Sequence, residues 1–319
     1  MDGTFFFKLL QDPLVFVISS GWTFSAGISV CLQESQGRPC RVLVQCSWYV
    51  PHIIAEIEDF RRTAGPQCRR MLLTYLCPTR SDVEFLNRRG FDSLHIHHNA
   101  FIDDRKFTLG QGVEKLYSAV HNANLMKFKR HRLAWGVQNI ALITYDPSGE
   151  NSFDEINGYR DLAFTNRSPS GTIKHLNEEE VSKIANESRC GLILSEIEGA
   201  NFASTEYLLC GIPIVSTPSL GGREEFFDPR HVKIVEPVAE AIEGAVTQWC
   251  ESAPPSQEIR ESVLEKCRVH RERLLHWLCA VSGQDLFTNL DDNIWSPLFT
   301  EKLRNWVIVP HYAIPKQEI

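Results

Sequence analysis

Short apolar runs rich in β-branched residues alternate along the chain with stretches of helical periodicity. This alternation is typical of βαβ units, in which helices join parallel strands. In the first third, the pattern predicts strands over 14–19, 41–47, 70–76 and 94–98, with helices over 51–63 and 80–89. The segment 20–32 leaves the first strand through a glycine-containing loop and enters a further helix.

A second set of alternating elements begins near residue 115. Strands are predicted over 116–120, 139–145, 162–165, 190–195, 213–217 and 232–236, and helices over 129–136, 177–187, 202–210 and 238–251. The apolar runs at 190–195 and 213–217 are unbroken, as expected for central parallel strands that are covered on both faces. A long helical pattern follows at 257–281.

Two polar breaks divide this pattern. The segment 101–115 is polar and holds two glycines, and 253–257 reads APPSQ. We therefore predict an N-terminal Rossmann-like domain over 1–110, a second Rossmann-like domain over 111–252, and a helical extension over 253–319. The extension should pack back on the body, because exposed Trp295 and Trp306 would be costly.

Composition narrows the class of protein. The 319 residues suffice for two modest domains, and the formal charge of -7 argues against a general nucleic-acid binder. The first 110 residues carry 12 Lys and Arg against 11 Asp and Glu, with a cluster at Arg61, Arg62, Arg69 and Arg70. This cluster is either a solvated surface or a site for an anionic acceptor or an anionic membrane face.

The ten cysteines are scattered without a CxxC pair, which favours a reducing compartment. The N-terminal apolar stretch is interrupted by Lys8, Asp12 and Pro13, so it is a poor signal peptide. No apolar run reaches about 18 residues, the minimum for a membrane span. We expect a cytoplasmic protein, with contact at the inner membrane face as an open alternative.

The segment 190–225 carries the clearest chemistry. A strand ends at Ser195, a turn follows that contains Gly199, and a helix begins near Phe202. Helix N-termini present free backbone N–H groups and a partial positive charge, and a glycine-containing turn lets a diphosphate approach closely. The site would lie at the carboxyl end of a parallel strand, where open α/β sheets bind ligands.

Two acids flank this turn. Glu198 precedes the helix and Glu206 lies in its first turns, with seven residues between them. One carboxylate accepts two hydroxyls at once, which suits the vicinal hydroxyls of a sugar or a ribose. The alternative reading is a turn acid and a surface helix acid without a ligand.

This segment resembles the E-x7-E element of retaining GT-B glycosyltransferases of the large "group 1", family 4-like class. The motif reads Glu198-Gly-Ala-Asn-Phe-Ala-Ser-Thr-Glu206, and the helix then ends at Gly211 before Pro213 and a buried strand. Gly221-Gly222-Arg223 also looks like the family. The resemblance covers residues 115–252 well, and the first 110 residues only in the order of strands and helices.

The resemblance implies an α/β protein of the GT-B fold, with two Rossmann-like parallel-sheet domains that face a cleft and a C-terminal helical extension. It implies that Glu206 binds the ribose hydroxyls of the donor and that Glu198 contacts the transferred sugar. It further implies that the diphosphate is held by the turn at Gly199 and by backbone N–H groups near Phe202, Ala203 and Ser204.

The resemblance also implies a basic residue after the first strand of the second domain. Lys129 best matches the family's phosphate lysine, and such a side chain neutralises a leaving diphosphate. The family commonly has an arginine about six residues earlier, where this chain has Ala123, so Lys127 or Arg130 would compensate or activity would be reduced. The alternative is an exposed basic helix face.

The first domain offers weaker signals. Gly21 and Gly27 would form a loop facing donor and acceptor, and His98 and Asn99 would lie near the cleft. His95 and His97 would share one face of a strand, opposite to His98. No third zinc ligand is evident, so we expect structural histidines rather than a metal site.

The resulting hypothesis is a hexosyltransferase-type enzyme that transfers a sugar from a nucleoside-diphosphate sugar to a glycan, lipid-linked or small-molecule acceptor with retention. It would serve glycan, glycoconjugate or polysaccharide biosynthesis and need no metal or other cofactor. Two alternatives stay open: a nucleotide-sugar epimerase of GT-B fold, and a degenerate, non-catalytic sugar-nucleotide-binding partner. The motif fixes neither the base, the sugar and the acceptor nor the oligomeric state.

Overall fold

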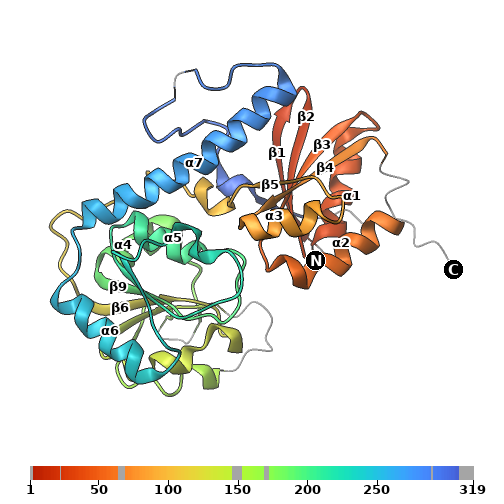
Figure 1. Cartoon of the computed structure of the whole chain (residues 1–319). Coiled ribbons are helices and arrows are strands. Elements are labelled where there is room, and N and C mark those ends of the chain that lie inside the picture. The colour runs from red at the N-terminus through yellow and green to blue at the C-terminus, as the bar shows by residue number, and fades with distance from the viewer. Residues whose placement is uncertain are drawn as a thin grey trace. The chain divides into compact units, whose positions relative to one another are not determined.

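The computed structural model describes residues 3–21, 23–63, 69–145, 153–168, 172–288 and 290–308. The chain forms two compact units: Met1–Ile102 with Cys267–Ile319, and Asp103–Lys266. The first division of the chain falls after Ile102, whereas the sequence predicted a domain boundary after residue 110. The second division falls inside helix α7 (Ser256–Ser282), so one helix contributes to both units (Figure 1).

The first unit contains a six-stranded sheet. Its strand order is β12 (Asn305–Ile308), β1 (Gly3–Gln11), β2 (Leu14–Ser19), β3 (Cys40–Gln45), β4 (Met71–Cys77) and β5 (Ser93–His95). Strands β2 to β5 are parallel, whereas β1 pairs antiparallel with both β2 and β12.

Each face of this sheet has its own core, because successive strand residues point to opposite sides. Phe16 and Ile18 of β2 pack with α1 (Phe24–Ser35), α2 (Val50–Thr63) and α3 (Arg80–Asn87). Val15 and Val17 pack on the other face with α7 and the segment after it.

Two features of this unit differ from the sequence prediction. The strands β1 and β12 were not predicted, and the strand expected over 94–98 ends at His95. His97 instead caps a 3₁₀ helix, η1 (His98–Phe101), and accepts a hydrogen bond from the Asn99 N–H at its Nδ1 (3.2 Å). The predicted strand faces of His97 and His98 were therefore wrong.

The second unit contains a wholly parallel six-stranded sheet. Its order is β11 (Val232–Ile234), β10 (Ile214–Ser216), β9 (Ser188–Ile193), β6 (Tyr117–Asn122), β7 (Ile140–Ile143) and β8 (Leu162–Phe164). The strand order reverses between β6 and β9, the place where ligands bind in open sheets of this kind.

Helices cover this sheet and largely follow the predicted ranges. They are α4 (Glu178–Asn186), α5 (Phe202–Leu209) and α6 (Ala239–Glu251). Asn177 and Glu180 form a capping box at the start of α4, which fixes where that helix begins. Short 3₁₀ helices also occur at η4 (Phe153–Glu155), η5 (Arg223–Phe226) and, in the first unit, η6 (Glu301–Leu303).

The helix predicted over 129–136 is absent. Two 3₁₀ turns, η2 (Lys127–Lys129) and η3 (His131–Ala134), stand in its place. Arg130 separates them in a left-handed conformation (φ 54°, ψ 44°), which ends a right-handed helix.

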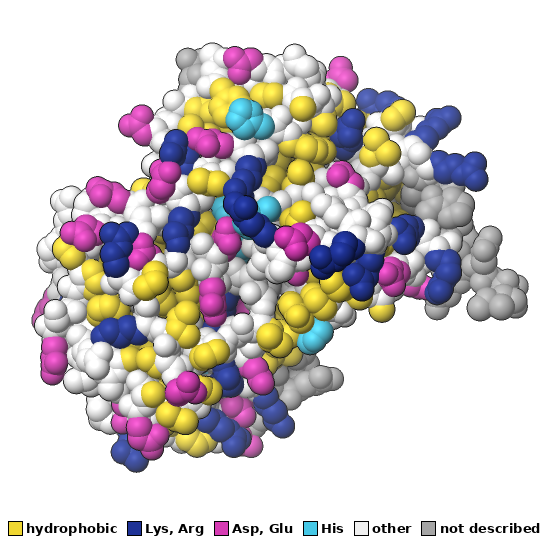
Figure 2. Space-filling model, viewed as in Figure 1, with side chains coloured by type: hydrophobic (Ala, Val, Ile, Leu, Met, Phe, Trp, Pro, Cys, Tyr) yellow, Lys and Arg dark blue, Asp and Glu magenta, His cyan; other side chains and the backbone are white. Residues whose placement is uncertain are grey.

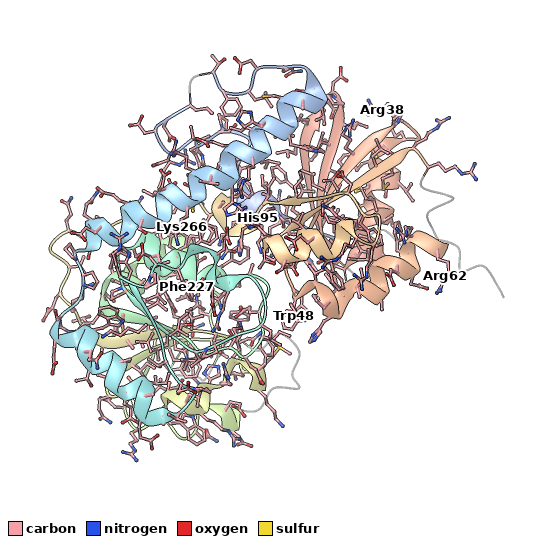
Figure 3. The ribbon with its side chains drawn as sticks, in the orientation of Figure 1. Arg38, Trp48, Arg62, His95, Phe227 and Lys266 are labelled. Atoms are coloured by element: carbon pink, nitrogen blue, oxygen red, sulfur yellow. The ribbon has the colours of Figure 1, made fainter. Side chains whose placement is uncertain are left out.

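The first half of α7 is tied to the second unit by cationic side chains. Arg260 Nη2 donates to the Asp104 carbonyl (2.7 Å). Lys266 Nζ donates to the Phe227 carbonyl, and both residues are labelled in Figure 3. Acidic and basic side chains are interspersed over the drawn face of this unit (Figure 2). Among the described residues, no helix is both long and apolar enough to cross a membrane.

Candidate functional site

The candidate site is built on two loops at the carboxyl edge of the second sheet. The loop after β9 and the loop after β10 are joined by a parallel bridge between Ile197 and Leu220. The Glu198 N–H donates to the Leu220 carbonyl (2.8 Å), and the Gly222 N–H donates to the Gly199 carbonyl (3.0 Å). Backbone hydrogen bonds therefore hold the turn around Glu198 in one conformation.

Gly221 makes this close approach of the loops feasible. Its φ is +113°, a conformation that side chains rarely adopt. A Cβ at this position would lie 2.1 Å from the Glu198 carbonyl oxygen. A side chain at 221 would therefore displace the backbone that carries Glu198.

Glu198 is buried and accepts hydrogen bonds from three side chains. Lys129 Nζ lies 2.5 Å from its Oε1, Asn201 Nδ2 lies 2.7 Å from its Oε2, and the Ser195 hydroxyl also donates to Oε2. The exposed fractions of the Lys129 and Glu198 side chains are only 11% and 10%. A buried ion pair of this kind needs such added hydrogen bonds to offset desolvation.

Asn201 joins this carboxylate to helix α5. Its Oδ1 accepts from the Ser204 N–H (2.9 Å), which makes Asn201 the N-cap of the helix. The N–H of Ser204, one of the three expected to hold a diphosphate, is therefore bonded within the protein in this structure. Phe202 and Ala203 occupy the first turn of α5, where the sequence placed them.

Arg223 lies under the same loops and is fully buried. Its Nη1 donates to the Ser195 carbonyl (2.7 Å) and hydroxyl (2.8 Å), and its Nη2 donates to the Ser216 hydroxyl (3.1 Å). Burial lowers the pKa of the Arg223 guanidinium to about 10, against the opposing effect of Glu198. Arg223 remains charged at neutral pH.

Arg130 adds a further positive charge to this edge. Its Nε donates to the Leu194 carbonyl (2.5 Å) and its Nη2 to the Thr217 hydroxyl (2.7 Å). Burial lowers the pKa of Arg130, and nearby Glu196 opposes this shift. Lys129, Arg130 and Arg223 thus bring three cationic side chains to an edge that also carries Glu196 and Glu198, and such cations can bind an anionic ligand.

A buried network holds the loop that carries Lys129. His131 Nε2 bonds to the Asn124 carbonyl (2.7 Å), while Nδ1 of His131 and Nδ1 of His121 both lie near the Tyr159 hydroxyl (3.3 and 3.1 Å). Burial lowers the pKa of His131 to about 4 and that of His121 well below its usual value, and the charge of Lys129 adds to both shifts. Both imidazoles are therefore neutral at pH 7.

Glu206 lies on α5 and is only 5% exposed. The neighbouring Tyr207 hydroxyl accepts from the Asn122 N–H (2.8 Å), which ties α5 to the end of β6. The structure therefore brings Lys129, Arg130, Glu198 and Gly199 together, and it places Glu206 farther along the same helix.

The candidate residues of the first unit have different surroundings. Gly21 lies in a turn (φ +87°), but Gly27 lies inside α1, where a Cβ would be 3.0 Å from the Ile18 side chain. The prediction that Gly27 forms part of a loop was therefore wrong: Gly27 allows α1 to pack closely against β2. His98 and Asn99 are buried, and burial, followed by the charge of Arg304, lowers the pKa of His98 to about 3.

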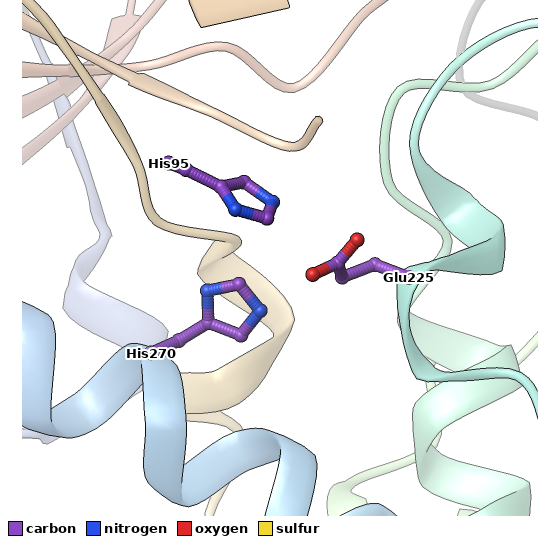
Figure 4. A group of neighbouring side chains, drawn as sticks. All are labelled: His95, Glu225 and His270. Atoms are coloured by element: carbon purple, nitrogen blue, oxygen red, sulfur yellow. The ribbon is translucent and has the colours of Figure 1, made fainter. Parts of the chain in front are cut away.

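Two further histidines of this unit face one another. The rings of His95 on β5 and His270 on α7 meet edge to face with centroids 5.1 Å apart (Figure 4). His270 Nδ1 also accepts from the His97 N–H (3.2 Å).

Three residues of the site were missed by sequence reasoning: Ser195, Asn201 and Arg223. An asparagine directly before a helix is a recognisable N-cap signal, so Asn201 could have been assigned. Arg223 follows Gly221 and Gly222, and the resemblance of this segment to the family gave the arginine no role. Nothing in the sequence pattern distinguished Ser195 from other residues at a strand end.

No family model matches the sequence, and no curated protein is similar enough to count as a relative. Solved structures do match. Sucrose-phosphate synthase from Thermosynechococcus elongatus is 13% identical, with a TM-score of 0.57 over 83% of this chain and 74% of that chain. HepE from Anabaena, solved with UDP and glucose, is 10% identical, with a TM-score of 0.58 over 83% of this chain and 77% of that chain.

TarM from S. aureus, solved with fondaparinux, alpha-GlcNAc-glycerol and UDP, is 12% identical, with a TM-score of 0.51 over 74% of this chain. This chain spans 50% of the length of that protein. Together with the two Rossmann-like sheets, these similarities show that the chain has the GT-B fold. At these identities they show the fold alone, and function must be argued from the site.

Proposed function

We propose that the protein is a glycosyltransferase that uses a nucleoside-diphosphate sugar as donor and transfers the sugar with retention. The observation that carries the proposal is the buried pair of Lys129 and Glu198 at the carboxyl edge of β6 and β9. These residues come from distant segments, and each matches a donor-binding position that the sequence resemblance implies. Their contact supports a single site in the second unit.

In the proposed mechanism, Lys129 and Arg130 offset the charge of the leaving diphosphate. Lys129 is bonded to Glu198 without ligand, so donor binding would let its ammonium group contact both the carboxylate and a phosphate oxygen. Stabilising charge that develops on the leaving group lowers the barrier to transfer. These cationic side chains take the role that a metal has in other transferases, so no metal is proposed.

The carboxylates of Glu198 and Glu206 are proposed to accept hydrogen bonds from hydroxyl groups of the donor. Glu198 would contact the transferred hexose, and Glu206 would bind the ribose of the nucleotide. HepE and TarM were each solved with UDP, which supports a nucleotide donor for this fold. The proposed acceptor is a glycan, a lipid-linked sugar or a small molecule, and the proposed setting is the cytoplasm.

The first test is binding of UDP, GDP, ADP and CMP, measured by thermal shift. A nucleotide at about 100 times its dissociation constant stabilises the fold by roughly 2.7 kcal/mol. One nucleotide should raise the melting temperature of the wild type and of Glu240→Gln, an exposed-helix control, but not of Glu206→Gln. If no nucleotide changed the melting temperature, the proposed donor site would be refuted.

The second test is turnover of the matching nucleotide sugars. Lys129→Ala should lower kcat by about 10²–10³-fold, the usual loss when one group that stabilises developing charge is removed. Transfer to an acceptor would support the proposal. Isomerised donor without transfer would indicate the epimerase, and binding without turnover across acceptor libraries would indicate the non-catalytic partner.

A further inference from the structure

The first unit contains a cavity of about 670 Å³ at the open edge of its sheet. Its walls are formed by α3, the edge strand β5 and α7, and these elements are labelled in Figure 1. The lining residues are Arg80, Val83, Glu84, Leu94, His95, Ile96, Arg273, His276 and Trp277. A cavity of this size is in the usual range for small-molecule sites.

Both helices contribute residues at helical spacing, so each presents one continuous face. Helix α3 contributes positions 80, 83 and 84, and α7 contributes 273, 276 and 277. Each face supplies one arginine and one apolar side chain, Val83 or Trp277. The two arginines therefore lie on opposite walls.

Both arginines have N–H donors that could bind a ligand. Arg273 Nη1 donates to the His95 carbonyl and contacts His95 Nδ1, each at 3.1 Å, which leaves its Nε and Nη2 without a protein partner among the described residues. Arg80 makes no side-chain hydrogen bond or ion pair within the same described ranges. Glu84 is the single acid in the lining, so the wall charge is net positive.

Apart from His95 and His276, the remaining lining is apolar. Leu94, Ile96 and Val83 join Trp277, whose ring also packs near the Arg41 guanidinium (5.9 Å). A flat apolar body fits beside an indole ring, while an anionic group fits between two guanidinium groups. A fully hydrated anion such as sulfate would leave this apolar wall without a contact.

The edge strand itself is poorly suited to bind a peptide strand. The Asp92 carbonyl accepts from the Tyr75 N–H of β4 (2.9 Å), so the His95 carbonyl points away from β4 toward the open edge. Arg273 already donates a hydrogen bond to that carbonyl. A protein strand that extended the sheet here would have to displace Arg273, and a small ligand would not.

We propose that this cavity binds a small molecule with one anionic group, a carboxylate or a phosphate, attached to an apolar ring. The anionic group lies between Arg80 and Arg273, and the ring lies against Trp277. The site belongs wholly to the first unit. The inference does not depend on the proposed sugar transfer.

The test is calorimetric titration of the full chain with 1-naphthyl phosphate, and with 1-naphthol as the matched neutral probe. 1-Naphthyl phosphate should bind and 1-naphthol should bind at least about tenfold more weakly, because charge-assisted bonds to arginine supply the difference. Arg80→Ala should weaken binding of the phosphate about tenfold, and Arg80→Lys should restore part of it. Arg62→Ala, an exposed change on α2 outside the lining, should bind like the wild type.

Three outcomes would overturn the proposal. These are no heat of binding at millimolar 1-naphthyl phosphate, equal affinity for the two probes, and unchanged affinity in Arg80→Ala. Arg80 is exposed, so its replacement should leave the circular dichroism spectrum and melting temperature unchanged. No nucleotide or sugar enters this experiment, so its failure is distinct from failure of the proposed transferase activity.

Discussion

At the scale of single residues, the second unit concentrates its unusual chemistry around one carboxylate. Glu198 is buried with Lys129, Ser195 and Asn201 as donors, and it opposes the lowering of the Arg223 pKa that burial causes. The sequence predicted Lys129 and Glu198 separately. Their contact follows from the neighbouring positions of β6 and β9, which the order of elements along the chain does not reveal.

Replacing Lys129 by methionine should destabilise the protein by about 3 kcal/mol, the low end for a broken buried pair, because Ser195 and Asn201 still solvate Glu198. The double variant Lys129→Met/Glu198→Gln should recover part of that loss. Lys174→Met is the control, since its pair with Glu180 is exposed and such pairs contribute roughly 1 kcal/mol or less. Urea denaturation measures all three, and equal midpoints for Lys129→Met and Lys174→Met would contradict the burial argument.

Gly221→Ala should cost about 3 kcal/mol or more. Its positive φ and the overlap of a Cβ with the Glu198 carbonyl act together. Gly244→Ala is the matched control, because Gly244 is helical and a Cβ there meets nothing within 4 Å. That change should be neutral or stabilise by up to about 1 kcal/mol. If Gly221→Ala and Gly244→Ala had the same melting temperature, the loops around Glu198 would be less constrained than the structure indicates.

At the scale of elements, the strands and long helices were largely predicted, and the short segments near the site were not. Periodicity identified β9, β10 and α5 because each is apolar and bounded by clear turn residues. The region 127–134 has a helical composition but forms two 3₁₀ turns, because Arg130 adopts a left-handed conformation there. The long-range bonds from its guanidinium to Leu194 and Thr217 favour that conformation, and no local pattern encodes them.

This loop should also make stability depend on pH. His131 has a folded pKa of about 4, below its ordinary value of 6.5, so the unfolded chain takes up the proton first as pH falls. Stability from this residue is unaffected above pH 7, decreases between pH 6.5 and 4, and is lower by roughly 3 kcal/mol at pH 4.

His131→Gln should weaken that dependence, because glutamine does not titrate, although buried His121 still does. Denaturant midpoints at pH 7 and pH 4.5 measure the effect as the difference between wild type and variant, which cancels the similar contribution of His98. His175→Gln, at an exposed position, should leave the dependence unchanged. A wild type and a His131→Gln variant with parallel pH profiles would show that His131 is not held neutral.

At the scale of the whole molecule, segments from the two ends of the sequence build one sheet. Strand β12 pairs with β1, and Trp295, Phe299 and Leu303 pack with Leu274 and Leu278 of α7 in the core of the first unit. The sequence predicted from Trp295 and Trp306 that the tail packs on the body: Trp295 is buried, but Trp306 is 50% exposed, so its part of that argument was wrong. The sequence did not reveal β12, which is a short and mostly exposed edge strand, or β1, whose pairing with β12 joins residues about 300 positions apart.

Two single substitutions in the tail, one at a buried and one at an exposed side chain, measure its contribution to the stability of the first unit. Phe299 is fully buried, with its ring 4.9 Å from that of Phe101, so Phe299→Ala should destabilise the first unit by about 3–5 kcal/mol. Ile308, on β12, is 63% exposed, so Ile308→Ala should change stability by less than about 0.5 kcal/mol. Because the chain has two compact units, calorimetry should show the transition of the first unit lowered in Phe299→Ala while that of the second is retained. Equal thermograms for the two variants would mean that the tail lies on the first unit without contributing to its core.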